Sequence, residues 1–332
     1  MSNNVLIFRT DRVGDLILSC PTIFTIKDHL KNSKITLISS SNNHEYAKSL
    51  AVFDDVNLFP RFGLIKKIKF IYNLSKKKFD YVFILDGKNR SILSAFFLNS
   101  NCKVAIISER KINKLWNIFK IKFFNNTNSN LINLFQEALG YCEINKKITN
   151  FNFLNKKIDN KFSLKIDIEN YLHIHLDEKW CSNIYIKSYN DINPKFEDIV
   201  KFIEELSLKH NILITTGLVD FKLLQDLRNN FFTQKYENIY FKKTSNKSIF
   251  FVYKPTFADI ESLLRKTKTL ISCHGAVTHA ANSFNVKIVD IIEKNKEAWY
   301  SRYTSYLNNY NLIYRNDFYK LKKNLIESAD YE

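Results

Sequence analysis

The chain has 332 residues, 45% of them hydrophobic, so it can bury a sizeable core and has the length of two domains. No apolar run approaches the roughly 18 residues needed to span a bilayer, and no basic segment precedes the short apolar run near the N-terminus, which argues against a secretory signal. The five cysteines are scattered and lack a Cys-x-x-Cys pair. This argues against a zinc site or a disulfide framework and fits a reducing cytoplasm.

The formal net charge is +17, from 50 Lys and Arg against 33 Asp and Glu. Such an excess attracts polyanions, which include nucleic acids, anionic lipids and phosphorylated substrates. The chain is also rich in Lys, Asn, Ile and Phe, as expected of an AT-rich genome, so charge alone does not choose among these partners. A nucleic-acid-binding protein is disfavoured because no reader motif is recognisable. A dehydrogenase is disfavoured because no Gly-x-Gly-x-x-Gly follows the first strand.

The first predicted unit is a strand followed at once by a helix. An apolar run at 5–8 leads through a polar turn into a helical pattern at 16–30. Such a unit begins a doubly wound sheet, which binds ligands at the carboxyl ends of its strands. Asp15, directly after Gly14, would stand at that end. The alternative is that Asp15 is only a helix-start residue favoured by the helix dipole.

The first half continues with alternating strands and helices, and 81–85 is apolar enough to be a central strand. Residues 145–168 lose this rhythm and are predicted to be a linker. The second half resumes it, with Thr256 and Asp259 forming a capping box. The remaining predicted strands are 34–39, 56–59, 103–107, 171–175, 212–215, 269–272 and 286–291, and the helices are 44–50, 63–75, 91–98, 194–210, 219–231, 257–265 and one between the last two strands.

A small-residue turn follows the predicted strand 269–272 and opens a helix near Val277. Backbone N–H groups at a helix start are unsatisfied and carry about half a positive charge, so they suit a diphosphate. Gly275 and Ala276 would allow the ligand close to the backbone. His279 is either a ligand contact or a packed histidine at the helix start. The chain thus reads as two α/β halves, and its last forty residues carry no chemical signal.

The segment from Arg9 to Pro21 resembles the opening motif of glycosyltransferase family 9, the heptosyltransferase group. In that motif an apolar strand leads to Arg or Lys, a Gly-Asp pair, an apolar stretch and Pro. The resemblance implies a GT-B fold, with two Rossmann-like domains facing across a cleft. The acceptor-binding domain would be 1–160 and the nucleotide-sugar-binding domain 161–332, with a last helix that can pack back on the first. Asp15 would be the catalytic base, with Arg12 and Gly14 beside the acceptor.

Further segments resemble the family in the same order along the chain. Lys88 and Arg90, after the strand 81–85, would point at an anionic acceptor. Lys179, next to Trp180, would offset charge on the departing nucleotide. The alternative for all three is a solvated cation. The loop after the strand 212–215 would hydrogen-bond the donor through Thr215, Thr216 and Gly217.

The turn before the last predicted helix resembles the family loop that holds the donor diphosphate. Aligning its histidine with His279 places Ala276 on the family glycine and His274 on the family acidic residue. These two departures prompt the alternative of a catalytically silent nucleotide-sugar-binding protein. The predicted donor contacts in this loop are His274, Gly275, Ala276, Val277, Thr278 and His279.

The resemblance implies an inverting transfer of heptose from ADP-heptose to a lipopolysaccharide core or a related lipid-linked glycan. Asp15 would take the proton of the acceptor hydroxyl as its oxygen attacks the anomeric carbon. The helix-start amides and Lys179 would stabilise charge on the diphosphate. No cofactor is implied, and no Asp-x-Asp motif in the second half suggests a metal. The expected location is the cytoplasm, with peripheral contact at the inner face of the membrane as an option and no nucleic-acid partner.

Overall fold

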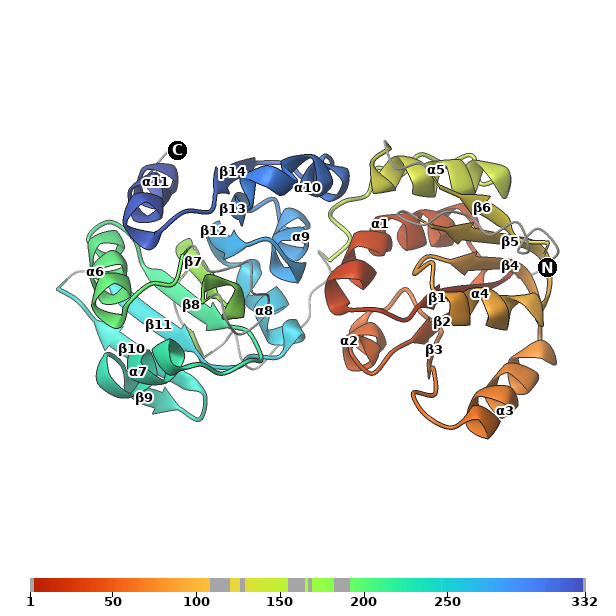
Figure 1. Ribbon diagram of the computed structural model, residues 1–332, viewed down its shortest axis with the longest axis horizontal. Helices are drawn as coiled ribbons and strands as arrows, with labels where there is room; N and C mark the ends of the chain where they lie inside the picture. Colours follow the sequence, from red (N-terminus) through yellow and green to blue (C-terminus); the bar gives the residue numbers. More distant parts are fainter. Residues whose placement is uncertain are drawn as a thin grey trace. The chain divides into compact units, whose positions relative to one another are not determined.

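The computed structural model describes residues 3–107, 120–125, 129–154, 165–166, 169–181, 192–245 and 247–330. Contacts divide the chain into two compact units, Met1–Phe153 with Ser301–Tyr306 and Leu154–Tyr300 with Leu307–Glu332. Each unit is built on one sheet with helices packed against it (Figure 1). The predicted domain boundary after residue 160, and the stretches 155–164 and 167–168 of the predicted linker, lie outside the described residues.

The first unit contains a six-stranded sheet in which every described strand pair is parallel. Its order, β3-β2-β1-β4-β5-β6, reverses direction between β1 and β4, and doubly wound sheets bind ligands at such a switch point. Its strands are β1 (Asn4–Arg9), β2 (Lys34–Ser39), β3 (Asp55–Leu58), β4 (Lys78–Ile84), β5 (Asn99–Ile106) and β6 (Lys122–Phe124), and its helices are α1 (Val13–His29), α2 (His44–Ser49), α3 (Leu64–Ser75), α4 (Asn89–Phe96) and α5 (Leu131–Tyr141).

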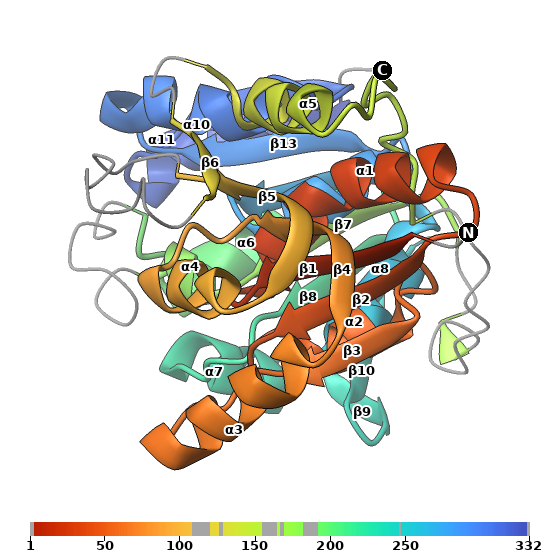
Figure 2. The same ribbon diagram turned by 90° about the vertical axis from the view of Figure 1, so that its right-hand side faces the viewer.

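β1 forms the centre of this sheet because its side chains are apolar on both faces. Val5, Leu6, Ile7 and Phe8 are all fully buried, as expected of a parallel strand covered on both sides. Leu6 and Phe8 pack in one cluster with Ile92 of α4. The view in Figure 2 shows α1 and α4 on either side of the strands of this unit. The polar residues that follow β1 therefore emerge at the edge of a rigid element.

The second unit contains an eight-stranded sheet in the order β14-β13-β12-β7-β8-β11-β10-β9. Its six strands from β14 to β11 are parallel and repeat the first unit's order, with the switch point between β7 and β12. The strands are β7 (Tyr171–Leu176), β8 (Ile212–Thr216), β9 (Thr233–Tyr236), β10 (Ile239–Lys243), β11 (Ser248–Val252), β12 (Thr267–Cys273), β13 (Lys287–Ile292) and β14 (Tyr310–Tyr314).

Apolar residues of the second unit form two clusters. One includes Leu172, Trp180, Phe202 and Ile271, and the other includes Leu213, Phe250 and Leu263. The capping box predicted at Thr256 is present. The C-terminal helix packs against α6, β13 and β14. Among the described residues, no helix combines the length and apolarity needed to cross a membrane. The helical segments are η3 (Glu178–Trp180), α6 (Phe196–Ser207), α7 (Lys222–Asn230), α8 (Phe257–Leu264), α9 (Ala276–Asn282), η4 (Lys294–Lys296), α10 (Glu297–Thr304), whose last residues cluster with the first unit, and α11 (Phe318–Asp330).

The region between α7 and α8 differs from the sequence-based prediction, which placed no strand there. β10 pairs antiparallel with both β9 and β11, and β11 extends the parallel sheet beside β8. All four residues of β9 are exposed, so its sequence lacks the alternating apolar pattern that marks a half-buried strand. β9 is therefore a strand because it pairs with β10, and its own sequence of apolar and polar residues does not indicate one.

Candidate functional sites at the two sheet switch points

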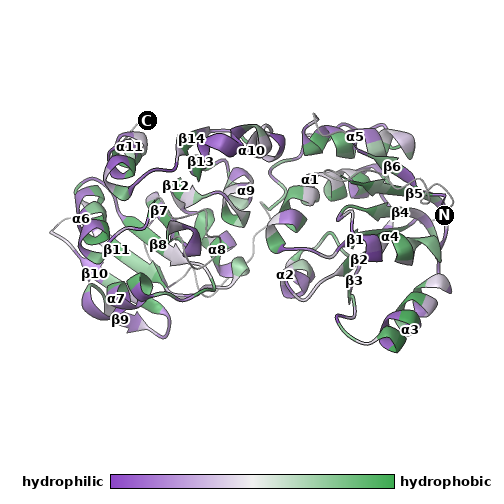
Figure 3. Cartoon of the chain, viewed as in Figure 1, coloured by the Kyte–Doolittle hydropathy of each residue, from purple (hydrophilic) through white to green (hydrophobic). Residues whose placement is uncertain are grey.

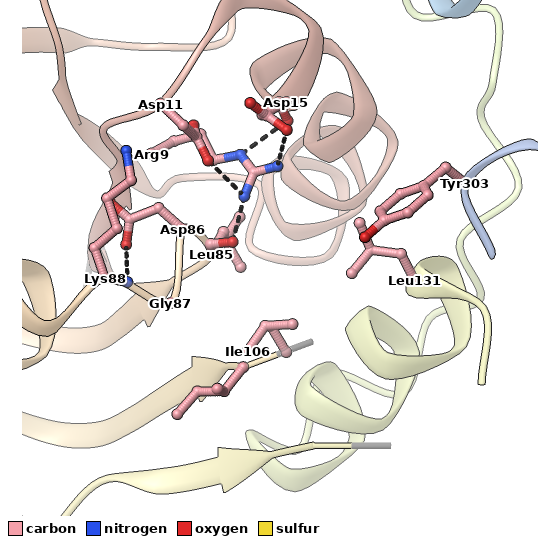
Figure 4. A pocket seen from close by; sticks show the side chains of 11 residues that line it. Arg9, Asp11, Asp15, Leu85, Asp86, Gly87, Lys88, Ile106, Leu131 and Tyr303 are labelled. Atoms are coloured by element: carbon pink, nitrogen blue, oxygen red, sulfur yellow. Dashed lines mark hydrogen bonds and ion pairs between the residues drawn. The ribbon is translucent and has the colours of Figure 1, made fainter. Parts of the chain in front are cut away.

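A buried arginine organises the switch point of the first unit. Arg9 ends β1 and is 4% exposed. Its guanidinium donates to the backbone carbonyls of Leu85 and Asp15, the latter at 2.8 Å (Figure 4). It also lies 3.4 Å from a carboxylate oxygen of Asp11 and 3.9 Å from one of Asp15. One buried cation thus holds two carboxyl groups at the carboxyl end of β1.

Asp15 combines the two roles that its sequence position suggested. Its carboxylate accepts the backbone N–H of Arg12 at 3.2 Å, so it caps the start of α1. The side chain is nevertheless 45% exposed and lines a pocket of the first unit. Capping leaves carboxylate lone pairs available for a ligand in the pocket, because a carboxylate can accept several hydrogen bonds.

Asp11 is a pocket residue that the sequence reasoning did not select. Burial raises the pKa of its carboxyl to about 6, with help from Asp15 and Asp86 and against the effect of Arg9 and Lys88. Its Oδ1 atom is buried and has no hydrogen-bond partner in the described part of the chain. The available signal was its place in the same polar turn as Asp15, in a segment that follows a buried strand.

The cations predicted to face the acceptor, Lys88 and Arg90, do lie at this switch point. Lys88 Nζ donates to the carbonyl oxygen of Thr10 at 2.6 Å, and Arg90 Nη2 donates to the same oxygen at 2.8 Å. Asp86, in the turn after β4, accepts from the hydroxyls of Thr10 and Ser91 at 2.6 and 2.8 Å. Both cations therefore already brace the turn after β1, and only their remaining donors can serve an acceptor.

The other predicted acceptor contacts are Arg12, which is exposed, and Gly14, which is half-buried beside Asp15. A further glycine, Gly87, has a structural requirement here. Its φ is +55°, and an added Cβ would lie 2.6 Å from the carbonyl oxygen of Ile106. Gly87 therefore lets the chain turn sharply between Asp86 and Lys88.

The pocket beside Arg9 has a volume of about 220 Å³ and belongs entirely to the first unit. Figure 4 shows Tyr303 and Leu131 on the side of the pocket away from Lys88 and Asp86. Tyr303 comes from the C-terminal region, in which the sequence carried no readable signal. The pocket is lined by Arg9, Asp11, Asp15, Leu85, Asp86, Gly87, Lys88, Ile106, Ile107, Leu131 and Tyr303.

At the switch point of the second unit, Lys179 lies against Gly275. A Cβ added at Gly275 would lie 2.6 Å from Lys179 Nζ, so the absence of a side chain there makes room for the ammonium group. The same Nζ contacts a carboxylate oxygen of Asp177 at 2.8 Å. Burial opposes the charge, but Asp177 outweighs it and raises the pKa of Lys179 above its ordinary value. The structure thus brings together the lysine and the small-residue turn that the sequence singled out separately.

The turn after β12 is fastened to a buried acid that the sequence reasoning missed. Asp290 of β13 is fully buried. Its two carboxylate oxygens contact His274 Nδ1 at 2.7 Å and the Thr278 hydroxyl at 3.2 Å, and Tyr310 donates to it at 2.9 Å. The Thr278 hydroxyl in turn accepts the backbone N–H of Gly275 at 3.2 Å. His274 occupies the position at which the family resemblance expects an acidic residue, and the carboxylate of Asp290 holds its imidazole.

The remaining residues of this turn divide into accessible and buried ones. Ala276 is half-buried, whereas Val277 and His279 are buried. Burial lowers the pKa of His279 well below its ordinary value, so its imidazole is neutral. The rings of His279 and His274 meet edge to face at 5.1 Å. This is the environment expected for a packed histidine, while the accessible part of the turn is 274–276.

The end of β8, where Thr215 and Thr216 lie, is more buried than a donor-binding loop would be. The Thr215 hydroxyl lies 2.7 Å from His173 Nε2 and 2.9 Å from His175 Nδ1, inside the sheet. The Thr216 hydroxyl accepts the backbone N–H of Lys254 at 2.8 Å. Both threonines are fully buried with their hydroxyls engaged, which leaves Gly217 as the accessible member of the three.

Arg315, just after β14, is a buried residue that contacts the backbone of the second site. It is 9% exposed, and its guanidinium donates to the carbonyl oxygen of Lys179 at 2.7 Å and to Cys273 Sγ at 3.4 Å. It therefore joins the loop after β7 to the end of β12. Nothing near Arg315 in the sequence indicates this role, because its partners lie far away along the chain.

The two sites offer different chemistry. The first presents carboxyl groups around a buried guanidinium, an arrangement that can accept a proton from a hydroxyl. The second presents an ammonium beside an open stretch of backbone, an arrangement that can hold an anionic group. No cluster of three or more His, Cys, Asp or Glu within the described ranges is placed to hold a metal ion.

Neither the family models nor the curated proteins with which the sequence was compared match it. Solved structures do match in fold. A glycosyltransferase family 9 structure from Veillonella parvula DSM 2008 has a TM-score of 0.67 at 13% identity, covering 97% of this chain and 89% of that one. The E. coli ADP-heptose LPS heptosyltransferase II has a TM-score of 0.67 at 10% identity, with 98% and 97% covered. The UDP-GlcNAc 2-epimerase from Methanocaldococcus jannaschii has a TM-score of 0.57 at 13% identity, with 100% and 92% covered.

The likeness extends over nearly the whole chain, and identities this low report on fold rather than on activity. The resemblance predicted from the motifs of the sequence is confirmed at this level. The chain therefore has the GT-B fold found in structures of glycosyltransferase family 9.

Proposed function

We propose that the chain is an inverting glycosyltransferase that moves a sugar from a nucleotide-diphosphate sugar to a glycan acceptor. The observation that carries the proposal is the pairing of sites. Carboxyl groups gather at the first switch point, and Lys179 lies against Gly275 at the second. The fold likeness to an ADP-heptose LPS heptosyltransferase supports ADP-heptose as donor and a lipopolysaccharide core, or a related lipid-linked glycan, as acceptor.

The first unit, with the domain 1–160 as its proposed extent, binds the acceptor. Asp15 takes the hydroxyl proton, because its side chain is 45% exposed and lines the pocket. Asp11 is a second acid in the same pocket and can hydrogen-bond the acceptor through its unpartnered oxygen. A base on the acceptor side and a leaving group on the opposite side give inversion at the anomeric carbon. Arg12, Gly14, Lys88 and Arg90 complete the proposed acceptor side.

The second unit, with the domain 161–332 as its proposed extent, binds the donor. Lys179 and the accessible backbone of 274–276 stabilise the negative charge that grows on the departing diphosphate. Gly217, which is half-buried after β8, is the proposed contact for another part of the donor. Charge compensation by a fixed ammonium makes transfer without a metal the simplest mechanism for these residues. The reaction is proposed to take place in the cytoplasm, at the inner face of the cytoplasmic membrane.

The proposed roles of Asp15 and Lys179 are tested by measuring turnover and ADP binding separately. With ADP-heptose and a lipopolysaccharide core acceptor, Asp15→Asn is expected to lower turnover at least about a hundredfold, the usual contribution of a general base. Its affinity for ADP should stay within about twofold of the wild type, since Asp15 is not a proposed donor residue. Lys179→Met should instead weaken ADP binding.

Other outcomes separate the alternatives. Tight ADP-heptose binding without transfer, in wild type and Asp15→Asn alike, would indicate a nucleotide-sugar-binding protein. Conversion of UDP-GlcNAc without any acceptor would indicate an epimerase. Turnover unchanged in Asp15→Asn would exclude Asp15 as the base.

A further inference from the structure

The helix α3 and the loop before it present apolar side chains that the core of the first unit does not use. The exposed fractions are 73% for Phe62, 72% for Leu64, 82% for Ile65, 58% for Ile68 and 60% for Tyr72. Leu64, Ile68 and Tyr72 recur every four residues and so share one face of the helix. We call these five residues the α3 surface. Single exposed apolar side chains are ordinary, but a contiguous group of this kind marks an interaction site.

A different face of α3 anchors the helix. Leu74 is its buried residue. Phe70 packs against the core of the first unit, where its ring lies 5.6 Å from that of Phe59. At about 3.6 residues per turn, Phe70 and Leu74 point roughly away from Ile65 and Ile68. The α3 surface is therefore additional to the face that folding requires.

The charge around the α3 surface has a single sign. Residues 56–79 contain no Asp or Glu. Within the described residues, no ion pair involves a cation of this segment. Two of the cations border the apolar residues directly, with Lys76 Nζ 4.3 Å from the Tyr72 ring centroid and Arg61 5.0 Å from that of Phe62. The cations are Arg61, Lys66, Lys67, Lys69, Lys76, Lys77 and Lys78.

We infer that the α3 surface docks on an anionic lipid bilayer. A helix with an exposed apolar stripe and a Lys-rich border lies in the plane of the interface, with its apolar side chains below the headgroups. The lysines reach back to the anionic headgroups, and the aromatic rings of Phe62 and Tyr72 sit at the boundary. A bilayer supplies an apolar layer beneath a negative one over the whole length of the segment. This matches a stripe that is apolar at its centre and cationic along its border.

The position of α3 ties this surface to the first site. In Figures 1 and 2, α3 projects from the β3 edge of its sheet, and Figure 3 shows both hydrophobic and hydrophilic residues on it. The loop that leads into α3 leaves the carboxyl end of β3. Because β3 runs parallel to β1 and β4, this loop begins at the same end of the sheet as Asp15. Phe59 of this loop also lies 5.5 Å beneath the guanidinium of Arg90. If the proposed function holds, docking presents the acceptor site to glycans carried by membrane lipids.

The test is co-sedimentation of the full chain with vesicles. One set contains phosphatidylglycerol and phosphatidylcholine in equal parts, and the other contains phosphatidylcholine alone. We expect binding to the anionic vesicles that NaCl reverses, and much weaker binding to the neutral ones. Ile65→Ser/Ile68→Ser should lower the partition coefficient between vesicles and solution at least about tenfold, because the variant inserts less apolar area into the bilayer. The control is Leu208→Ser/Tyr319→Ser, which changes two apolar residues of the second unit that are at least as exposed on average, and it should bind as the wild type does.

Equal binding by the α3 variant and the wild type would overturn the proposal, as would the absence of binding to anionic vesicles. Self-association without vesicles, abolished by the same variant, would assign the surface to a second copy of the chain and also overturn it. The proposed function is tested separately with a lipid-free core oligosaccharide as acceptor. Ile65→Ser/Ile68→Ser should transfer to this soluble acceptor at the wild-type rate. A wild-type chain that binds vesicles but transfers nothing would refute the transferase proposal and leave the docking surface standing.

Discussion

The ammonium group of Lys179 occupies the space in which a side chain at Gly275 would begin, 2.6 Å from the position of the missing Cβ. The two residues lie on loops after β7 and β12, which are neighbours in the sheet. Position 275 therefore controls where the positive charge of the second site can lie.

Gly275→Ala is expected to weaken ADP binding about tenfold while changing the free energy of unfolding by less than about 1 kcal/mol. The new methyl group would displace Nζ, which ends a flexible side chain and can move at little cost. Calorimetric titration with ADP and thermal unfolding measure the two quantities. In a double-mutant cycle with Lys179→Met the two effects should be less than additive. Additive effects, or an unchanged affinity in Gly275→Ala, would contradict this coupling.

The raised pKa of Asp11 predicts how the stability of the chain depends on pH. Its folded-state pKa of about 6 lies above the ordinary value of 3.8, so the folded state binds more protons between these values. Stability contributed by the protonated group is therefore present below about pH 4 and lost as the pH rises to about 6. Asp11→Asn should remove this loss and gain at most about 3 kcal/mol at neutral pH, less whatever the contact with Arg9 contributes.

Urea unfolding across this pH range is the measurement. Asp28→Asn, at an exposed acid on α1 of the same unit, is the control and should leave the pH profile as it is in the wild type. An Asp11→Asn profile that parallels the wild type would show that Asp11 is not the group responsible.

Arg315→Met tests whether the hydrogen bond from Arg315 to the Lys179 carbonyl oxygen positions the loop that carries Lys179. The methionine keeps the apolar stem but removes the hydrogen bonds to the Lys179 carbonyl and Cys273. We expect a destabilisation of about 1–3 kcal/mol and a several-fold weaker affinity for ADP. Arg315→Lys should recover part of the affinity, since one donor is restored. If Arg315→Met lowers stability and leaves the affinity for ADP intact, Arg315 supports the fold but does not position Lys179.

Thr215→Val distinguishes a structural hydroxyl from a donor contact. The substitution keeps the shape of the side chain and leaves ring nitrogens of His173 and His175 without their shared partner. The expected cost is about 1–3 kcal/mol of stability, with ADP affinity within about twofold of the wild type. Gly217→Ala is the contrasting variant. Its Cβ would lie 2.8 Å from Glu178 Oε2 and 3.1 Å from Asp177 Cβ, so it should disturb the loop and weaken ADP binding. A large loss of affinity in Thr215→Val would restore its hydroxyl as a donor contact.

Much of the fold could be predicted from hydrophobic periodicity. The strand predicted at 34–39 is β2 with the same bounds, and the helix predicted at 63–75 is α3 within one residue. The apolar run 81–85 lies mostly in β4, beside the central strand β1. These elements were predictable because burial on one or both faces leaves a pattern in the chain itself. The exposed strand β9 leaves none.

The sites were predictable only where a residue stands beside a pattern. Asp15 follows a buried strand, and Gly275 opens a turn after another, so the local sequence determines that both lie at carboxyl ends of strands. Tertiary structure alone decides that Lys179 lies against Gly275 and that Arg315, 136 residues from Lys179, holds its loop. It also decides that the hydroxyl of Thr215 is enclosed between two imidazoles. The physical reason is that periodicity records which face of an element is buried, whereas the partners of a buried polar group are set by distant segments that meet only when the sheet is assembled.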